Sequence, residues 1–234
     1  MLIGQNFDKI EWRVFDIIIQ EPNVFITDTI MAITSLYLGF LLHSKKNSNA
    51  FTKWWYAFFI LFGISSFFGG LGHAWFFYFG AKGKMINWVT GFIAIYFIER
   101  AMISAVDNLN KRKLYERLVL GKLIFVFAVF SWVIATQPID VKPELGFLPL
   151  AIHTIIGVFA TAGILAYSLS KVKNEAYKYF YYGVGIILPS AFFFLLKINP
   201  VNWFDKNDVS HVFVTIGNIF FYLGVQKVNA TKAI

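Results

Sequence analysis

Residues 54–79 read WWYAFFILFGISSFFGGLGHAWFFYF, an apolar stretch without a single Asp, Glu, Lys or Arg. About 20 such residues are enough for an α-helix to cross a bilayer, so this stretch predicts a transmembrane helix. The whole chain has the same character, because 58% of its 234 residues are hydrophobic and 20% are aromatic. Soluble domains contain roughly 45–50% apolar residues. The sequence therefore predicts an integral membrane protein.

Seven stretches of this kind predict an all-α polytopic membrane protein with seven transmembrane helices. The expected spans are 24–43, 54–79, 85–106, 118–137, 147–170, 178–196 and 209–227. The connections between them are too short to form another domain. We therefore assign residues 24–234 to one seven-helix transmembrane domain.

Residues 1–23 are expected to form a separate N-terminal segment. Its apolar residues Phe7, Ile10, Val14 and Ile17 recur at roughly helical spacing, which predicts a short amphipathic helix on the membrane surface. Charged residues interrupt the apolar ones, so the segment does not have the continuous apolar region of a signal peptide.

Lys and Arg are more frequent on one side of the predicted spans than on the other. They concentrate in the loops after the first, third and fifth spans and after the seventh. Cytoplasmic loops carry such an excess, so the N-terminus should lie outside and the C-terminus inside a cell (inner) membrane. This distribution also accounts for the net charge of +8 without a nucleic-acid partner. Because the chain has no Cys, thiolate metal sites and cysteine nucleophiles are excluded.

Five ionisable residues fall near the outer ends of four predicted spans. They are Asp28, His73, His153, Asp208 and His211. Ionisable groups at membrane depth are unfavourable and usually mark functional sites, so their common level predicts a shared site. By contrast, Glu99, Arg100 and Lys122 are expected to reach the inner headgroups as long interfacial side chains.

Two spans carry their polar residues on a single face. In the second span this face consists of Ser66, Gly69, Gly70 and His73. In the last span it consists of Asn207, His211, Thr215 and Asn218. Small and polar residues mark places where membrane helices approach closely, so both faces should point into the bundle. Interhelical packing and hydrogen bonding alone would explain part of this pattern.

The chemistry that these residues suggest is metal-assisted hydrolysis. Zinc binds imidazole nitrogen and carboxylate oxygen, and a catalytic zinc site has three protein ligands and one open position. His73 and His211 are the first candidate ligands. The third could be Asp208, His153 or Asn207, although Asn is a poor zinc ligand and Asp208 could instead orient His211.

Two further residues have candidate roles in such a reaction. Asp28 could act as the general base toward a metal-bound water. Ser66 could hold the water or a developing oxyanion. The standard motifs of nucleotide hydrolases, serine hydrolases and zinc proteases are absent from the sequence.

The sequences GGLGH at 69–73 and NDVSH at 207–211 carry a family resemblance. The chain resembles a family of bacterial seven-helix membrane proteins of unknown function, DUF6962. More distantly it is similar to the CREST superfamily of alkaline ceramidases, adiponectin-receptor-like proteins and haemolysin III relatives. That resemblance implies zinc held by a histidine of the second helix and an H-x-x-x-H pair of the seventh, with Ser and Asp nearby. The chain departs from this pattern, with Asn207 at the first histidine of the pair and Gly69 at the serine.

A second resemblance concerns the residues before the first span. Glu21, Pro22 and Asn23, followed by Asp28, look like the acidic calcium-binding stretch of alkaline ceramidases. Oxygen ligands of this kind suit calcium. The same residues also form an ordinary turn and helix start.

Two classes of function therefore follow from the sequence. The first is a zinc-dependent hydrolase that acts on a lipid amide or ester at the outer leaflet, with a membrane lipid or lipid-like molecule as substrate. The second is a non-enzymatic receptor, sensor or ion-binding or ligand-binding protein that uses the same polar cavity. Metal content is the property that separates them most directly.

Overall fold

The computed structural model describes residues 1, 3–6, 8–47 and 49–231. In these ranges seven helical segments are long and apolar enough to cross a membrane, which confirms the predicted fold class. The segments are Pro22–Lys45, Ala50–Ala74, Phe76–Ser104, Leu109–Thr136, Pro143–Val172, Glu175–Leu195 and Lys206–Ala230. The protein is therefore a multi-pass membrane protein.

The third and fifth segments each contain two α-helices, and the first and sixth each combine one α-helix with a 3₁₀ turn. The helices are α1 (Pro22–Leu42), α2 (Ala50–Ala74), α3 (Phe76–Phe79), α4 (Met85–Ser104), α5 (Leu109–Thr136), α6 (Pro143–Val158), α7 (Ala166–Val172), α8 (Lys178–Leu195) and α9 (Lys206–Ala230). Short 3₁₀ turns are η1 (His43–Lys45), η2 (Gly80–Lys84) and η4 (Glu175–Tyr177). A π-helix, η3 (Phe159–Leu165), joins α6 to α7.

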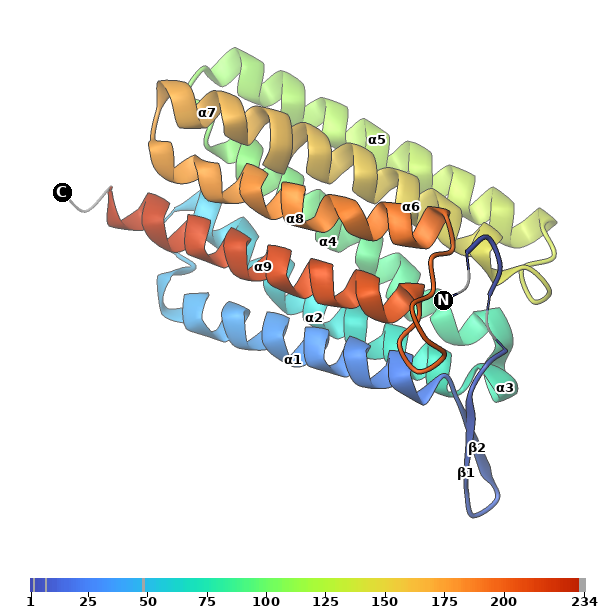
Figure 1. Ribbon diagram of the computed structural model, residues 1–234. Helices are drawn as coiled ribbons and strands as arrows, with labels where there is room; N and C mark the ends of the chain where they lie inside the picture. Colours follow the sequence, from blue (N-terminus) through green and yellow to red (C-terminus); the bar gives the residue numbers. More distant parts are fainter. Residues whose placement is uncertain (2, 7, 48, 232–234) are drawn as a thin grey trace.

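The N-terminal segment forms a β-hairpin, so the expected surface helix was wrong. Strands β1 (Glu11–Val14) and β2 (Ile17–Gln20) pair in antiparallel register, with Val14 opposite Ile17. β-Branched residues favour strands, and Phe15 adopts a left-handed conformation (φ 54°) in the tight turn between them. These local preferences prevail over the helical spacing. The hairpin projects from the end of the bundle where α1 begins (Figure 1).

The long helices run side by side along one axis (Figure 1). The most extensive contacts join α1 with α2, α2 with α4, and α8 with α9, and α1 also packs against α9. Helix α5 packs mainly against α4 and α6. As a result, the beginning of α1, the end of α2 and the beginning of α9 lie at the hairpin end of the bundle.

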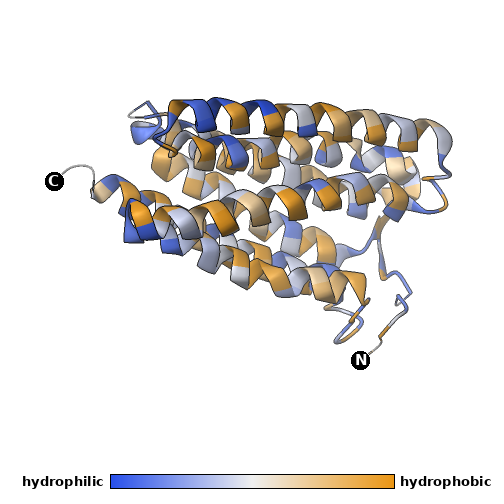
Figure 2. Ribbon diagram, turned by 90° about the horizontal axis from the view of Figure 1, so that it is seen from above, coloured by the Kyte–Doolittle hydropathy of each residue, from blue (hydrophilic) through white to orange (hydrophobic). Residues whose placement is uncertain are grey.

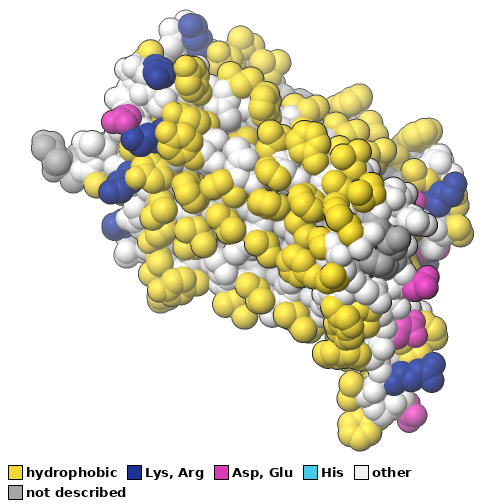
Figure 3. All heavy atoms as spheres, in the orientation of Figure 1, with side chains coloured by type: hydrophobic (Ala, Val, Ile, Leu, Met, Phe, Trp, Pro, Cys, Tyr) yellow, Lys and Arg dark blue, Asp and Glu magenta, His cyan; other side chains and the backbone are white. Residues whose placement is uncertain are grey.

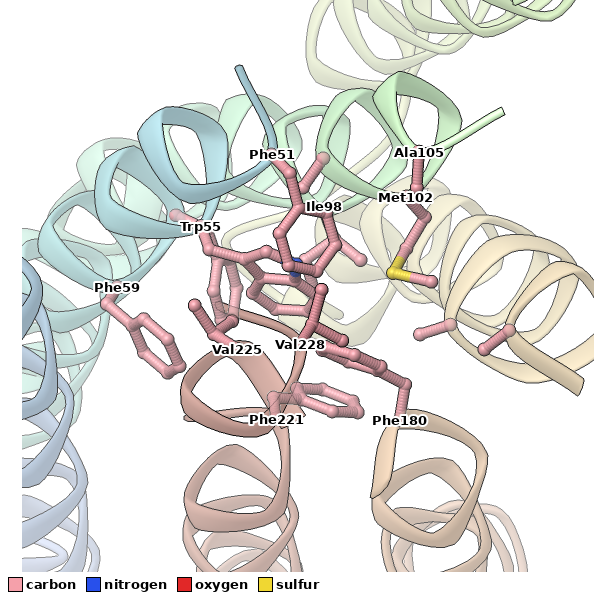
Figure 4. Close-up of a cluster of buried hydrophobic side chains, with 14 of the residues drawn as sticks. Phe51, Trp55, Phe59, Ile98, Met102, Ala105, Phe180, Phe221, Val225 and Val228 are labelled. Atoms are coloured by element: carbon pink, nitrogen blue, oxygen red, sulfur yellow. The ribbon is translucent and has the colours of Figure 1, made fainter. Parts of the chain in front are cut away.

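The main hydrophobic core fills the half of the bundle that is remote from the hairpin. Trp55 of α2 is fully buried and stacks on Phe180 of α8, with ring centroids 5.1 Å apart. Phe221 of α9 packs against both rings, as Figure 4 shows. Buried aromatic area of this kind stabilises the helix contacts. A second hydrophobic cluster around Trp88, Phe92 and Phe130 joins α4 and α5 nearer the hairpin end.

The surface of the bundle is apolar in the middle and charged at the ends. Ile124, Phe192 and other large apolar side chains of the helices are exposed, as expected where lipid surrounds the protein. The middle of the helices is largely hydrophobic, and hydrophilic residues gather toward their ends (Figure 2). Figure 3 shows several Lys and Arg at the end that carries the C-terminus, whereas acidic side chains lie beside a few basic ones around the hairpin.

Candidate functional site: the polar cluster at the hairpin end

The beginning of α9 is fixed by a capping box. The side chain of Asp205 accepts hydrogen bonds from the backbone N–H groups of Asn207 and Asp208, and Asp208 in turn accepts from the backbone N–H of Asp205. This reciprocal arrangement satisfies backbone donors that a helix end otherwise leaves without partners. Burial raises the pKa of Asp205, which lies just outside the membrane-spanning segment.

Asp208 is fully buried and joins α9 to α1. Its carboxylate accepts hydrogen bonds from Asn23 Nδ2 at 2.7 Å, Thr27 Oγ1 at 2.8 Å and the backbone N–H of Asp205 at 2.9 Å. A buried carboxylate is stable only where donors replace its lost hydration. Asn23 and Thr27 stand one helical turn apart on α1 and supply two of these donors. The three residues thus form the centre of the cluster.

His211 follows Asp208 by three residues and lies against the same face of α1. Its Nδ1 is 2.9 Å from Thr27 Oγ1. Thr27 has one hydroxyl proton, which it donates to Asp208, so its oxygen receives a hydrogen bond from His211 Nδ1–H. The remaining ring nitrogen, Nε2, is 3.5 Å from Asp28 Oδ1, which exceeds an ordinary hydrogen bond.

Asp28 lies between α1 and α2, where two glycines make room for it. A Cβ on Gly70 would lie 3.0 Å from the Cβ of Asp28, and one on Gly69 would lie 2.9 Å from the amide nitrogen of Asn87. The small-residue face of α2 therefore points into the bundle, toward α1. Asp28 is 4% exposed, so its carboxyl group is largely sheltered from the surroundings.

His73 forms the second part of the cluster, together with Glu21 and two lysines. His73 Nδ1 is 2.8 Å from Glu21 Oε2, and Lys84 Nζ lies 3.1 Å from His73 Nε2. Lys9 also pairs with Glu21, at 3.3 Å. Burial alone would raise the pKa of Glu21, but His73, Lys9 and Lys84 outweigh it and hold this pKa well below its usual range.

A small groove opens beside His211 between α1 and α9. Its volume is about 130 Å³. The lining residues are Thr27, Ile30, His211, Val212, Thr215 and Ile216. The three apolar residues are partly exposed on the surface that faces the membrane, whereas Thr27 and His211 belong to the buried hydrogen-bond network. Almost all of the lining surface is apolar, and the polar atoms of Thr27 and His211 lie behind it.

The family of unknown function DUF6962 matches residues 23–230 of the chain. The chain belongs to the DUF6962 family. The match begins at the first turn of α1 and ends at the last residue of α9, so it covers all seven membrane-spanning segments. The chain matches no curated protein and no solved structure.

In this DUF6962 protein the candidate ligands His73 and His211 lie at the same end of the bundle but share no hydrogen-bond partner. His73 contacts Glu21 and Lys84, and His211 contacts Thr27 and Asp28. No group of three or more His, Asp or Glu in the described ranges is arranged to hold a metal ion. The Lys84 ammonium beside His73 Nε2 also opposes a second cation there. This arrangement does not fit the zinc site that the sequence suggests.

The other predicted site residues of the DUF6962 protein have separate surroundings. His153 lies on α6, where its Nε2 is 3.2 Å from the carbonyl oxygen of Phe92 on α4. Ser66 donates to the carbonyl oxygen of Phe62 in its own helix. Asn207 belongs to the capped first turn of α9, and its amide group contacts Asp205. The structure thus brings together Asp28, Asp208 and His211, with His73 beside them.

The residues of the suggested calcium stretch also have different partners. The carboxylate of Glu21 contacts His73 and Lys9, whereas Asn23 donates its amide hydrogen to Asp208. Asp28 faces His211 instead. These contacts therefore do not bring the side-chain oxygen atoms of Glu21, Asn23 and Asp28 together as the ligands of one calcium ion.

Sequence reasoning missed Thr27 and Lys84. Thr27 is four residues after Asn23, so a polar face of α1 that includes Asp28 was visible in the sequence. Lys84 seemed to be an ordinary loop residue because the second span was expected to continue to residue 79. Instead α2 ends at Ala74, and η2 folds back so that Gly72 and Lys84 come into contact.

Proposed function

We propose that this protein binds a lipid-like ligand in the groove between α1 and α9 and acts as a receptor or sensor. The observation that supports this proposal is an apolar groove on the membrane side, whose inner side is formed by Thr27 and His211 with their hydrogen-bonded polar atoms directly behind it. Ligand sites are typically apolar cavities with a few well-placed polar groups. The polar head of the ligand would contact His211, and its chain would lie along Ile30 and Ile216.

The size of the groove limits which part of a ligand it can hold. At about 130 Å³ it is smaller than the roughly 300–1,000 Å³ of a pocket that encloses a whole small molecule. It suits the head of an amphipathic molecule whose chain remains in the lipid. Thr27, which is itself hydrogen-bonded to Asp208, holds His211 in place, which favours a defined head-group geometry.

Photolabelling tests this proposal. We expect a photoreactive fatty acid to label residues around 27–30 and 211–216 of the reconstituted protein, and unlabelled fatty acid to compete. Ile30→Trp should fill the groove and reduce this labelling, and His211→Phe should reduce it by removing the polar contact. Ile33→Trp is the matched control, because Ile33 is exposed on the same helix but does not line the groove. Labelling that is uniform over the apolar surface and insensitive to Ile30→Trp would contradict ligand binding.

A zinc-dependent hydrolase of lipid amides or esters is the second candidate. The observation that favours it is the proximity of Asp28 to His211 beside the groove, since a carboxylate near a ligand histidine could serve as a base. This function requires His73 and His211 to move together around one zinc ion. The resemblance to the CREST superfamily implies such a zinc site. In that case purified protein carries zinc, His73→Ala and His211→Ala lose it, and Asp28→Asn keeps zinc but loses hydrolysis. Wild-type protein that neither contains nor takes up zinc would leave ligand binding as the function.

A further inference from the structure

A second polar cluster lies in the half of the bundle formed by α4, α5 and α6. Glu99 of α4 is 2% exposed, and its Oε1 is 2.7 Å from the ammonium nitrogen of Lys122 on α5. The sequence led us to expect both side chains at the inner headgroups, and this expectation was wrong. The pair is held inside because α5 packs against α4 and places Lys122 beside Glu99.

Gly157 of α6 provides the space for this ion pair. A Cβ at this position would lie 2.9 Å from Lys122 Nζ and 3.0 Å from Glu99 Oε1. The π-helix η3 begins two residues later, and Thr161 within it donates to the carbonyl oxygen of Gly157. π-Helical turns are rare and occur frequently at functional sites. Glycine and π-helix together indicate that α6 is shaped around the charged pair.

The cluster contains more hydrogen-bond acceptors than donors. Glu99 Oε2 is buried and has no hydrogen-bond partner among the described residues. The same holds for Nδ1 of His153, whose Nε2 carries the hydrogen because it faces the carbonyl oxygen of Phe92. Lys122 Nζ contacts both neighbours, since it also lies 3.4 Å from the carbonyl oxygen of His153. Buried acceptors without donors are unfavourable.

We propose that Glu99 is a buried proton-binding site, separate from the groove, which takes up a proton on Oε2 and releases it again. A proton can be bound without a cavity. It neutralises the buried carboxylate and turns Oε2 of Glu99 from an acceptor without a partner into an O–H donor. The charged and titratable groups that face Glu99 are Lys122 from α5 and, through Lys122, His153 from α6. Among the described residues α2 and η3 bring no charged side chain to it. Arg100, next to Glu99 on α4, is paired with Glu116 at 3.3 Å. Ionisable groups inside membrane proteins commonly serve proton transfer.

Infrared difference spectroscopy on reconstituted protein tests the proposal directly. Protein with ¹³C-labelled glutamate should show a protonated carboxylic acid band that disappears on titration to alkaline pH. The band should be lost in Glu99→Gln and kept in Glu144→Gln, an exposed control. Lys122→Met removes the cation that favours the carboxylate, so the titration should move upward by about 1–3 pH units.

A purely structural ion pair predicts a different result. Glu99 would then remain a carboxylate at every pH at which the protein is folded, and Glu99→Gln would change only thermal stability; this outcome overturns the proposal. The double variant Glu99→Gln/Lys122→Met removes both charges and avoids leaving one of them unpaired. This double variant provides a folded reference if Glu99→Gln is unstable. A carboxylic acid band that persists in the double variant would also overturn the assignment to Glu99.

Discussion

Thr27 connects Asp208 of α9 to His211 in the polar cluster. Its single hydroxyl donates to Asp208 and accepts from His211, so it fixes which ring nitrogen carries the hydrogen. That leaves His211 Nε2 near Asp28 but beyond ordinary hydrogen-bonding distance. A ligand group that reached this nitrogen would meet a ring that is already oriented. The orientation of the His211 ring therefore depends on Thr27, which stands next to Asp28 in the sequence but was not among the candidate residues.

Glu21 should make the stability of the protein depend on pH. Its pKa in the folded protein is lowered below the ordinary value of 4.5, so the folded state binds this proton more weakly than the unfolded state. The stabilisation that ionised Glu21 gives to the folded state is therefore fully present above pH 4.5 and is lost as the pH falls below this value. In Glu21→Gln we expect a lower thermal midpoint at neutral pH and a smaller further decrease on acidification. Thermal unfolding in mild detergent measures both, and Glu144→Gln, at an exposed position, is the control. An equal acid sensitivity in wild type and Glu21→Gln would refute this assignment.

The seven spans could be predicted because length and apolarity determine whether a helix can cross a membrane. Their ends could not, since they depend on local contacts. Helix α2 ends at Ala74, which allows Lys84 to reach His73, and no periodicity in the apolar run 54–79 marks this end. The common level of Asp28, Asp208 and His211 was visible in the sequence. Their partners were not, because neutral Thr27 and Asn23 resemble ordinary helix residues until α1 and α9 are packed together.

The α1–α2 contact beside Asp28 should not tolerate a side chain at Gly70. A Cβ there would lie 3.0 Å from the Cβ of Asp28 and 3.1 Å from the ring of Phe25. We therefore expect Gly70→Ala to destabilise the protein by about 1–3 kcal/mol, as in overpacked cores. Gly121→Ala in α5 is the matched control, because no described atom lies within 4 Å of the position that its methyl group would take, and alanine favours helix by about 1 kcal/mol. Thermal unfolding of both variants checks this, and equal stability would show that α1 and α2 are less closely packed.

At the scale of the whole molecule, the hairpin end holds both the polar cluster and a second hydrophobic cluster around Trp88 and Phe92. Aromatic side chains around Trp55 fill the half remote from the hairpin, and the hydrogen-bonded cluster around Asp208 occupies the hairpin end. The polar cluster therefore lies near one membrane surface, with packed aromatic side chains beneath it. Which surface this is depends on orientation. The excess of Lys and Arg at the opposite end favours the outer side for the cluster and its groove.

Cysteine labelling determines this orientation, and the natural chain, which has no cysteine, provides an unlabelled background. Lys82→Cys and Lys142→Cys lie at exposed positions on the hairpin side of the membrane segments, whereas Lys113→Cys and Lys171→Cys lie at exposed positions on the other side. With the N-terminus outside, a membrane-impermeant thiol reagent should label the first pair in intact cells and the second only after the membrane is opened. The physical reason is the preference of Lys-rich and Arg-rich loops for the cytoplasm. Labelling of Lys113→Cys and Lys171→Cys alone in intact cells would place the groove at the cytoplasmic leaflet, and a ligand would then have to come from inside the cell.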